Sequence, residues 1–259
     1  MIRRLYRYVT GLVLLVLAGC ASPVLSGPAG PDPLQAALLA EGVDPAVAAL
    51  VIYRLEDEKV WRWGGARVDQ RFSPASTSKI PHTLLAFETG AVTGPDETFE
   101  WDGETRFVES WNQDQTFSQA FQRSAVWVYQ IVVPRIGAER LTGGFRDFGY
   151  GNGEIGGPEK ITDYWLASPL AISAAEQVAF LSRLARRTLP LSARTYELAV
   201  PAMELARGEG WVMYGKTGWK GAVDGDGSDI GWFVGWVEQT AGEAPGTYAF
   251  AFNKDMPGG

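Results

Sequence analysis

Strand-type sequence stands at both ends of this 259-residue chain, and helix-type sequence lies between. Residues 47–55 and 59–64 are rich in β-branched and aromatic side chains and flank a short turn around Asp57, which indicates a β-hairpin. Three more strand patterns, WVMYGKTGW, DIGWFVGWVE and TYAFAFNKDM, follow residue 210. We therefore expect an α+β fold: a mainly antiparallel sheet, flanked by helices, in which the first and last strands are joined and an all-helical subdomain is inserted.

Two segments in the middle of the chain carry helix signals. Residues 118–137 place apolar side chains at near-helical spacing, which predicts a helix. Ser173 and Glu176 form a capping-box pattern ahead of an apolar run, with Arg186 and Arg187 expected in the last turn and Pro190 beyond it. In the late strand GWFVGWV, large side chains and glycines predict a buried strand with close backbone approach on one side.

Composition and charge narrow the classes of partner. Hydrophobic residues make up 46% of the chain and charged residues 20%, as in a soluble globular protein. The formal net charge is −7, and removal of Arg3, Arg4 and Arg7 with an N-terminal leader that contains no acid makes it −10. Such a surface repels phosphates, so we expect no nucleic-acid partner. An anionic small substrate needs a local cationic pocket.

The N-terminus carries an export signal. A basic start, MIRRLYR, precedes an apolar run at 9–19 that is too short to span a bilayer, so residues 1–19 are predicted to be a signal peptide. The run ends in LAGC, which resembles the bacterial lipobox. That resemblance implies cleavage before Cys20 and its diacylation. The alternative is an ordinary signal peptide with a chance cysteine.

Cys20 is the only cysteine, so the sequence offers no disulfide and no thiol for metal binding or catalysis. Residues 20–34 are rich in proline, glycine and serine and are expected to be a flexible tether to a folded domain at 35–259. In lipoproteins, Ala21 after the cysteine favours the outer membrane. We expect a periplasmic protein, lipid-anchored to that membrane.

Ser76 and Lys79 form an S-x-x-K pattern. On one helical face their Cβ atoms would lie about 5–6 Å apart, and a serine at a helix start lies near backbone N–H groups able to stabilise an oxyanion. Pro81 removes one backbone hydrogen bond from such a helix, and this loss is smallest close to the first turn. The pattern alone is unspecific, since it occurs by chance in many proteins.

His82, the sole histidine, is a poor partner for Ser76. Six residues on a helix correspond to about 600° of rotation and about 9 Å of rise, so the two side chains point apart. His82 is interpreted as a packing or surface residue. A catalytic zinc site typically takes three protein ligands drawn from histidine, cysteine and carboxylates. Since the chain has one histidine and one cysteine, a metal site is not expected either.

Three further motifs follow in order: Ser124-Ala125-Val126, Tyr150-Gly151-Asn152 and Lys216-Thr217-Gly218. With them the chain resembles the class D serine β-lactamases from about VIYRLED to the last strand. The resemblance is densest in RFSPASTSKIPHTLLAFETGAV, WNQDQ, RSAVWVYQ, DYWL, KTGW and GWFVGWVE. Class A enzymes and many penicillin-binding proteins carry S-D-N where this chain has Ser124-Ala125-Val126.

The resemblance implies an active site between the sheet and the helical insertion, with Ser76 as the acylated nucleophile. It also implies that CO2 carboxylates Lys79, without a separate cofactor. Since only a neutral amine attacks CO2, the pKa of Lys79 must be lowered by desolvation. The carbamate would then be the general base for acylation and deacylation. A positioned base typically raises the reaction rate by about 10²–10⁴-fold.

The same resemblance assigns the walls of the site. Val126 and Trp165 would enclose the carbamate, and Trp165 would donate a hydrogen bond to it; plain core packing is compatible with both roles. The oxyanion hole would be the backbone N–H groups of Ser76 and Trp219, donors of a kind worth about 10²–10³ in turnover.

The remaining motifs are assigned to the substrate and to the scaffold. Ser124 would relay a proton to the leaving nitrogen. Lys216, Thr217 and Gly218 would line the pocket for the substrate carboxylate, whereas a KTG alone is typical of a strand end with a solvated lysine. The Tyr150 motif is interpreted as structural.

Three features depart from the pattern or stand outside it. Ser78 occupies a position where many family members have phenylalanine, so we expect a wetter pocket and stronger dependence on bicarbonate. The chain ends at DMPGG, before the C-terminal helix and carboxylate-binding arginine of the family. The acidic segment 223–229 is similar to a calcium loop, but it lacks the required glycine and glutamate, which favours a solvated hairpin turn.

The leading hypothesis is a periplasmic, lipid-anchored serine β-lactamase whose partner is a β-lactam small molecule. A penicillin-binding peptidase and a β-lactam sensor or binding lipoprotein without turnover remain open. The oligomeric state and the preferred β-lactam subclass are also open.

Overall fold

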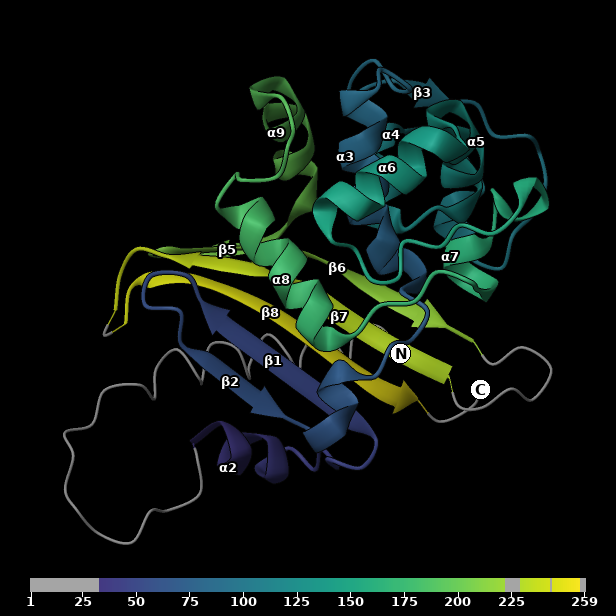
Figure 1. Cartoon of the computed structure of the whole chain (residues 1–259). Helices are drawn as coiled ribbons and strands as arrows, with labels where there is room; N and C mark the ends of the chain where they lie inside the picture. Colours follow the sequence, from purple (N-terminus) through teal and green to yellow (C-terminus); the bar gives the residue numbers. More distant parts are fainter. Residues whose placement is uncertain (1–32, 222–228, 243, 257–259) are drawn as a thin grey trace, which may run out of the picture.

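The computed structural model describes residues 33–221, 229–242 and 244–256. Its centre is a six-stranded antiparallel sheet in the order β2-β1-β8-β7-β6-β5 (Figure 1). The strands are β1 (Ala48–Arg54), β2 (Val60–Trp63), β5 (Glu204–Gly208), β6 (Trp211–Lys220), β7 (Asp229–Gln239) and β8 (Gly246–Met256). Because β1 pairs with β8 along its whole length, the first and last parts of the chain meet in one sheet, and the predicted α+β fold is confirmed.

Helices surround the sheet and form the insertion. They are α2 (Pro33–Ala40), α3 (Lys79–Glu88), α4 (Phe117–Arg123), α5 (Val126–Ile136), α6 (Ala138–Phe148), α7 (Tyr164–Ala167), α8 (Ala174–Ala185) and α9 (Ala193–Ala199). In Figure 1, α8 lies along one face of the sheet, α3 to α7 gather beside it, and α2 lies on the opposite face. A small ladder of β3 (Thr98–Phe99) and β4 (Gln115–Thr116) belongs to the insertion.

Short 3-10 turns connect these elements. They are η1 (Gly65–Asp69), η2 (Ala75–Ser78), η3 (Glu109–Trp111), η4 (Pro158–Lys160) and η5 (Val200–Met203). Of these, η2 runs directly into α3 and brings the S-x-x-K pattern beside the sheet.

The period-two alternation of the strands divides the core in two. In β8, Ala249 and Ala251 belong to the cluster that the helical insertion and α8 complete, whereas Phe250 and Phe252 belong to the cluster that Leu34 and Leu38 of α2 join. In β8, therefore, small residues face the helices and large ones face α2.

The late strand is buried as predicted, since the first nine residues of β7 are all buried. A Cβ added at Gly235 would lie 2.0 Å from the Tyr214 carbonyl oxygen, so glycine permits the close approach of β6 and β7. Beside it, the rings of Tyr214 and Trp236 stack with centroids 4.8 Å apart.

The helix predicted over 118–137 is in fact two helices, which is a correction. Helix α4 ends at Ser124, whose φ of 62° lies in the left-handed region, and α5 begins at Val126 after an extended Ala125. The apolar spacing continues across the break because both helices pack against the same core. The break places Ser124 at a helix end.

The capping box at Ser173 and Glu176 is confirmed, with both of its hydrogen bonds formed at the start of α8. The other end differs from the prediction: Arg186 is the C-cap and Arg187 follows with a φ of 55°, so neither lies in the last turn.

The boundary of the folded body also differs from the expectation. Helix α2 begins at Pro33 and Leu34 is buried, so the last two residues of the expected tether at 20–34 belong to the fold. Cys20 and the predicted signal peptide at 1–19 lie outside the described residues. Among the residues that are described, none of the helices has the length and apolar character needed to cross a bilayer.

Candidate active site

Ser76 and Lys79 meet at the junction of η2 and α3. The Lys79 ammonium nitrogen Nζ donates a hydrogen bond to Ser76 Oγ at 2.9 Å, as the one-turn spacing predicts. Ala75, just before the serine, has a φ of 47°, which is rare outside glycine and is held by a hydrogen bond from Ser78 Oγ to its carbonyl at 2.7 Å. Backbone strain of this kind gathers at functional sites.

Burial makes Lys79 an unusual lysine. Its side chain is fully buried, and burial together with the nearby charge of Lys216 lowers its pKa well below the ordinary value. The ring centroid of Tyr129 lies 5.1 Å from Nζ. A lysine in such surroundings is readily neutral, and a neutral amine is a base and a nucleophile.

Trp165 of α7 supplies an unused hydrogen-bond donor. The residue is fully buried, and its indole Nε1 has no hydrogen-bond partner among the described residues. A buried polar group without a partner is costly, so it points to an acceptor that completes the site. Val126, at the start of α5, is half-buried and packs against the same core cluster as Trp165.

A second lysine comes from the sheet. Lys216 of β6 is nearly fully buried and donates hydrogen bonds to Ser124 Oγ at 2.7 Å and to the Thr217 carbonyl at 3.1 Å. Burial lowers the pKa of Lys216 to about 7. The structure therefore brings together Ser124 of the Ser-Ala-Val motif and Lys216 of the Lys-Thr-Gly motif, two residues predicted to belong to the site.

Strand β6 runs directly beside the serine turn. A Cβ added at Gly218 would lie 2.9 Å from the Pro74 carbonyl oxygen and 3.2 Å from the Thr77 amide nitrogen, so only glycine allows this contact. Ser76 and Trp219 therefore sit on adjoining elements, as an oxyanion hole made of their N–H groups requires. Trp219 is 46% exposed, and its Nε1 donates to Asp229 at 2.9 Å.

The Tyr150-Gly151-Asn152 motif makes hydrogen bonds within the scaffold. Asn152 donates to the Pro169 carbonyl at 2.9 Å and accepts from the Ala171 amide at 3.0 Å. Tyr150 is fully buried, and its hydroxyl lies 3.4 Å from Nε2 of Gln177. These contacts fit the structural role expected of the motif.

Gln177 was not identified from the sequence. It is fully buried on α8, and its Nε2 donates to Thr77 Oγ1 at 2.9 Å, which fixes the turn that carries Ser76. The only available signal was its place four residues after the Ser173 cap, on the face of α8 that the pattern predicts to be buried.

His82 is a packing residue and is not on the surface. It is fully buried, its Nε2 lies 2.7 Å from the Tyr164 hydroxyl, and its ring packs against Trp165. Burial, with a smaller effect of the Lys79 charge, lowers its pKa to about 3, so the ring is neutral at physiological pH.

The expectation that Ser78 admits water is not supported. Its side chain is fully buried, and its hydroxyl is bonded to the Ala75 carbonyl of its own turn. Since Lys79 is also fully buried, the serine at position 78 does not expose the lysine to solvent.

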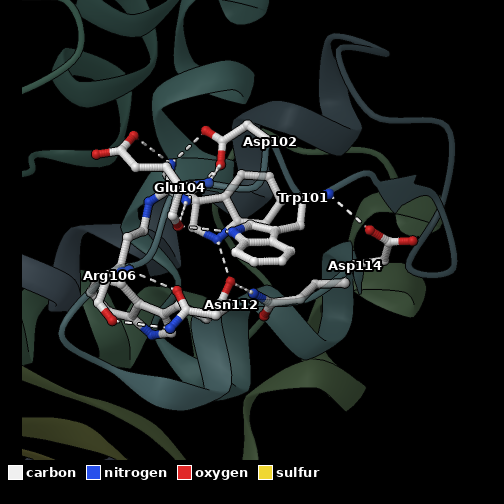
Figure 2. Close-up of polar contacts among 9 residues, drawn as sticks. Trp101, Asp102, Glu104, Arg106, Asn112 and Asp114 are labelled. Atoms are coloured by element: carbon white, nitrogen blue, oxygen red, sulfur yellow. Dashed lines mark hydrogen bonds and ion pairs between the residues drawn. The ribbon is translucent and has the colours of Figure 1, made fainter.

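A self-braced loop from Trp101 to Asp114 lies in the insertion (Figure 2). The Trp101 amide donates to Asp114 at 2.8 Å, and the Arg106 guanidinium binds both carboxylate oxygens of Asp102 at 2.7 and 2.8 Å. Asn112 accepts from the Arg106 amide at 2.8 Å and donates to its carbonyl at 3.0 Å.

The loop is tied to the candidate site at its end. Trp111 Nε1 donates to the Arg123 carbonyl at 2.8 Å, next to Ser124, and Trp127 Nε1 donates to the Trp111 carbonyl at 3.1 Å. At the outside of the loop, Phe107 is 83% exposed and packs edge-on against Trp111.

In the part of the chain that the structure describes, His, Cys, Asp and Glu side chains form no group of three suited to a metal ion. The acidic segment 223–229 lies outside the described residues except for Asp229, and its assignment to a turn stays a prediction.

Comparison with known proteins identifies the class. The model of the penicillin binding protein transpeptidase domain family matches residues 50–257. The fold, with its S-x-x-K turn beside a lysine-bearing strand, therefore defines a penicillin-binding, transpeptidase-type domain.

Individual relatives show which family within this class the chain belongs to. The chain is 39% identical to β-lactamase OXA-15 of Pseudomonas aeruginosa over 79% of this chain and 70% of that protein. It is 34% identical to the probable β-lactamase YbxI of Bacillus subtilis over 80% and 74%. A crystal structure of a class D β-lactamase from Nostoc matches with a TM-score of 0.76 and 40% identity, over 82% of this chain and 86% of that one. The chain belongs to the class D β-lactamases, enzymes that hydrolyse β-lactams.

Proposed function

We propose that this protein hydrolyses the β-lactam amide bond through an acyl-enzyme on Ser76, with carboxylated Lys79 as general base. The observation that carries the proposal is the 2.9 Å contact of Lys79 Nζ with Ser76 Oγ at a fully buried lysine. The unpartnered indole N–H of Trp165 supports the carboxylated form, because a carbamate offers the acceptor that this donor lacks.

Carboxylation begins with the neutral amine of Lys79. Its nitrogen lone pair forms a bond to the carbon of CO2, and the nitrogen then loses a proton, which leaves a carbamate anion. Burial favours the neutral amine that starts this step. Lys216, whose ammonium is nearby and also buried, offsets the negative charge once it has formed.

In acylation, the carbamate takes the Ser76 proton as Oγ attacks the β-lactam carbonyl. The N–H groups of Ser76 and Trp219 would stabilise the oxyanion of the tetrahedral intermediate. As the C–N bond breaks, Ser124 gives its hydroxyl proton to the departing nitrogen and regains one from Lys216, 2.7 Å away. The product is an ester on Ser76.

Before deacylation, the protonated carbamate passes the proton that came from Ser76 to Lys216, which restores the carbamate and the ammonium. The carbamate then removes a proton from a water molecule, which attacks the ester carbonyl, and this proton returns to Ser76 Oγ as the ester bond breaks. Lys216, with Thr217 and Gly218 beside it, would bind the substrate carboxylate. This supplies the local positive charge that the acidic chain, of net charge −7, otherwise lacks.

The lipid anchor and the periplasmic location rest on the sequence of residues 1–21 alone. We propose that Cys20 is diacylated and holds the enzyme at the outer membrane. Labelling of the expressed full chain with a radioactive fatty acid would test the acylation: label in the unaltered protein and none in C20S supports it, whereas an unlabelled unaltered protein, or a C20S that keeps the label, contradicts it.

Turnover separates hydrolase from peptidase. The protein without residues 1–20 is mixed with an excess of a chromogenic β-lactam, with S76A as the control. Many turnovers per molecule, absent in S76A, support the proposal. A burst of one equivalent with a lasting adduct on Ser76 would instead indicate a penicillin-binding peptidase or a sensor without turnover, and no reaction with no adduct would indicate a non-catalytic protein.

A further inference from the structure

Three buried aromatic rings, one of them on α3 three residues after Lys79, form a closed triangle. The ring centroids of His82 and Trp165 lie 5.0 Å apart, those of Tyr164 and Trp165 lie 5.0 Å apart, and those of His82 and Tyr164 lie 5.7 Å apart. All three contacts are edge-to-face, with interplanar angles of 73°, 87° and 84°. The three residues are fully buried.

A hydrogen bond locks one side of the triangle. Nε2 of His82 lies 2.7 Å from the hydroxyl oxygen of Tyr164. Edge-to-face contacts alone leave a ring free to slide, whereas a short hydrogen bond fixes how His82 and Tyr164 stand to each other. Trp165, which contacts both rings, is therefore held on two sides.

The triangle borders the lysine pocket. His82 follows Lys79 by three residues on α3, so their side chains share one helix face. Both contact the same ring: Lys79 Nζ lies 5.1 Å from the Tyr129 centroid, and the His82 centroid lies 6.3 Å from it.

The ring of His82 is suited to hold position without competing for charge. It is neutral, because burial lowers its pKa to about 3, and Tyr164 keeps its proton, because burial raises the pKa of its hydroxyl. A charged imidazolium here would pair with an anion on Lys79. Because the ring is neutral, the anion on Lys79 remains available to accept a hydrogen bond from the Trp165 indole.

We propose that His82 is a positioning residue for the Lys79 base, which acts with Tyr164 to hold the Trp165 indole so that its N–H is directed at the carboxylated lysine. This inference rests on the proposed function, because it requires the carbamate. His82 itself does not take part in the proton transfers.

The test removes the hydrogen bond and keeps the rings. Y164F deletes only the hydroxyl, and H82F provides a second variant with an aromatic ring in place of the imidazole. The matched control is Y196F, because Tyr196 is also buried and donates to the Leu189 carbonyl at 3.0 Å. The readouts are the bicarbonate concentration that gives half-maximal turnover and the ¹³C NMR signal of the carbamate after addition of ¹³C-bicarbonate.

If the proposal is right, Y164F needs roughly tenfold more bicarbonate for half-maximal turnover, a change of about 1.4 kcal/mol in carbamate stability. Turnover at saturating bicarbonate returns close to that of the unaltered protein, and Y196F behaves like the unaltered protein throughout. H82F changes in the same direction as Y164F.

Unchanged bicarbonate dependence in a folded Y164F would overturn the proposal and leave the proposed function intact. A different result separates the two claims: absence of any carbamate signal in the unaltered, active protein would remove the proposed mechanism and this inference together.

Discussion

Lys216 Nζ lies 2.7 Å from Ser124 Oγ, although 92 positions separate the two residues. The lysine comes from β6 of the sheet and the serine from the end of α4 in the helical insertion. This contact joins the two parts of the molecule at the point where Ser76 and Lys79 also lie. The site is therefore an interface between sheet and insertion, as the resemblance implied.

The burial of Lys216 predicts a pH-dependent stability. Its pKa is lowered to about 7 from the ordinary 10.5, so between these values the unfolded chain binds more protons than the folded one. The free energy of unfolding should consequently rise with pH in this window. We expect the rise between pH 7 and 9 to be larger by about 2 kcal/mol in the unaltered protein than in K216M. Urea titrations in CO2-free buffer at several pH values would measure it.

Other groups that titrate in the same window are shared by both proteins, so the difference between the two curves reports on Lys216 together with its effect on the pKa of Lys79. Parallel curves for the unaltered protein and K216M would show that burial does not shift this lysine.

Gly218 is predicted to be intolerant of any side chain. A methyl group there would meet the Pro74 carbonyl at 2.9 Å and the Thr77 side chain at 3.0 Å, and would push β6 away from the serine turn. We expect G218A to lose about 1–3 kcal/mol of stability and about tenfold or more in turnover, since oxyanion donors act over short distances. Steady-state kinetics and thermal unfolding would check both.

G94A is the matched control for this substitution, because a Cβ at Gly94 meets nothing within 4 Å. Equal turnover in G218A and G94A would mean that the close contact of β6 with η2 has no bearing on catalysis.

Asn112 is predicted to hold the loop of Figure 2 together. Its side chain makes two hydrogen bonds to the backbone of Arg106, and no other side chain duplicates them among the described contacts. N112A should lose about 1–2 kcal/mol of stability and show faster hydrogen exchange at residues 102–107. Q113A, which removes one exposed bond to the Ser110 carbonyl, should show neither change. Slow exchange retained in N112A would assign the brace to the ion pair of Arg106 with Asp102 instead.

Local sequence rules predicted most of the fold. The hairpin of β1 and β2, the last three strands and the cap of α8 follow from signals within a few residues of each other. The break at Ser124 was missed because apolar spacing continues through it, and a left-handed serine leaves no signal in the spacing.

The chemistry-bearing residues were predictable, and their supports were not. Ser76 and Lys79 are neighbours in the sequence, so geometry brings them together without a knowledge of the fold. Gln177 and Tyr164, by contrast, support the site through hydrogen-bond partners about 80 to 100 residues away. His82 was set aside because it faces away from Ser76, yet it lies against the same Tyr129 ring as Lys79.

The central claim concerns a single amine that loses its proton, captures CO2 and serves Ser76. The most direct measurement is ¹³C NMR of the protein in ¹³C-bicarbonate, recorded together with turnover, with K79A as the control. One carbamate resonance per molecule, which grows with turnover as bicarbonate is added and is absent from K79A, is the predicted result. Full turnover without that resonance would contradict the claim.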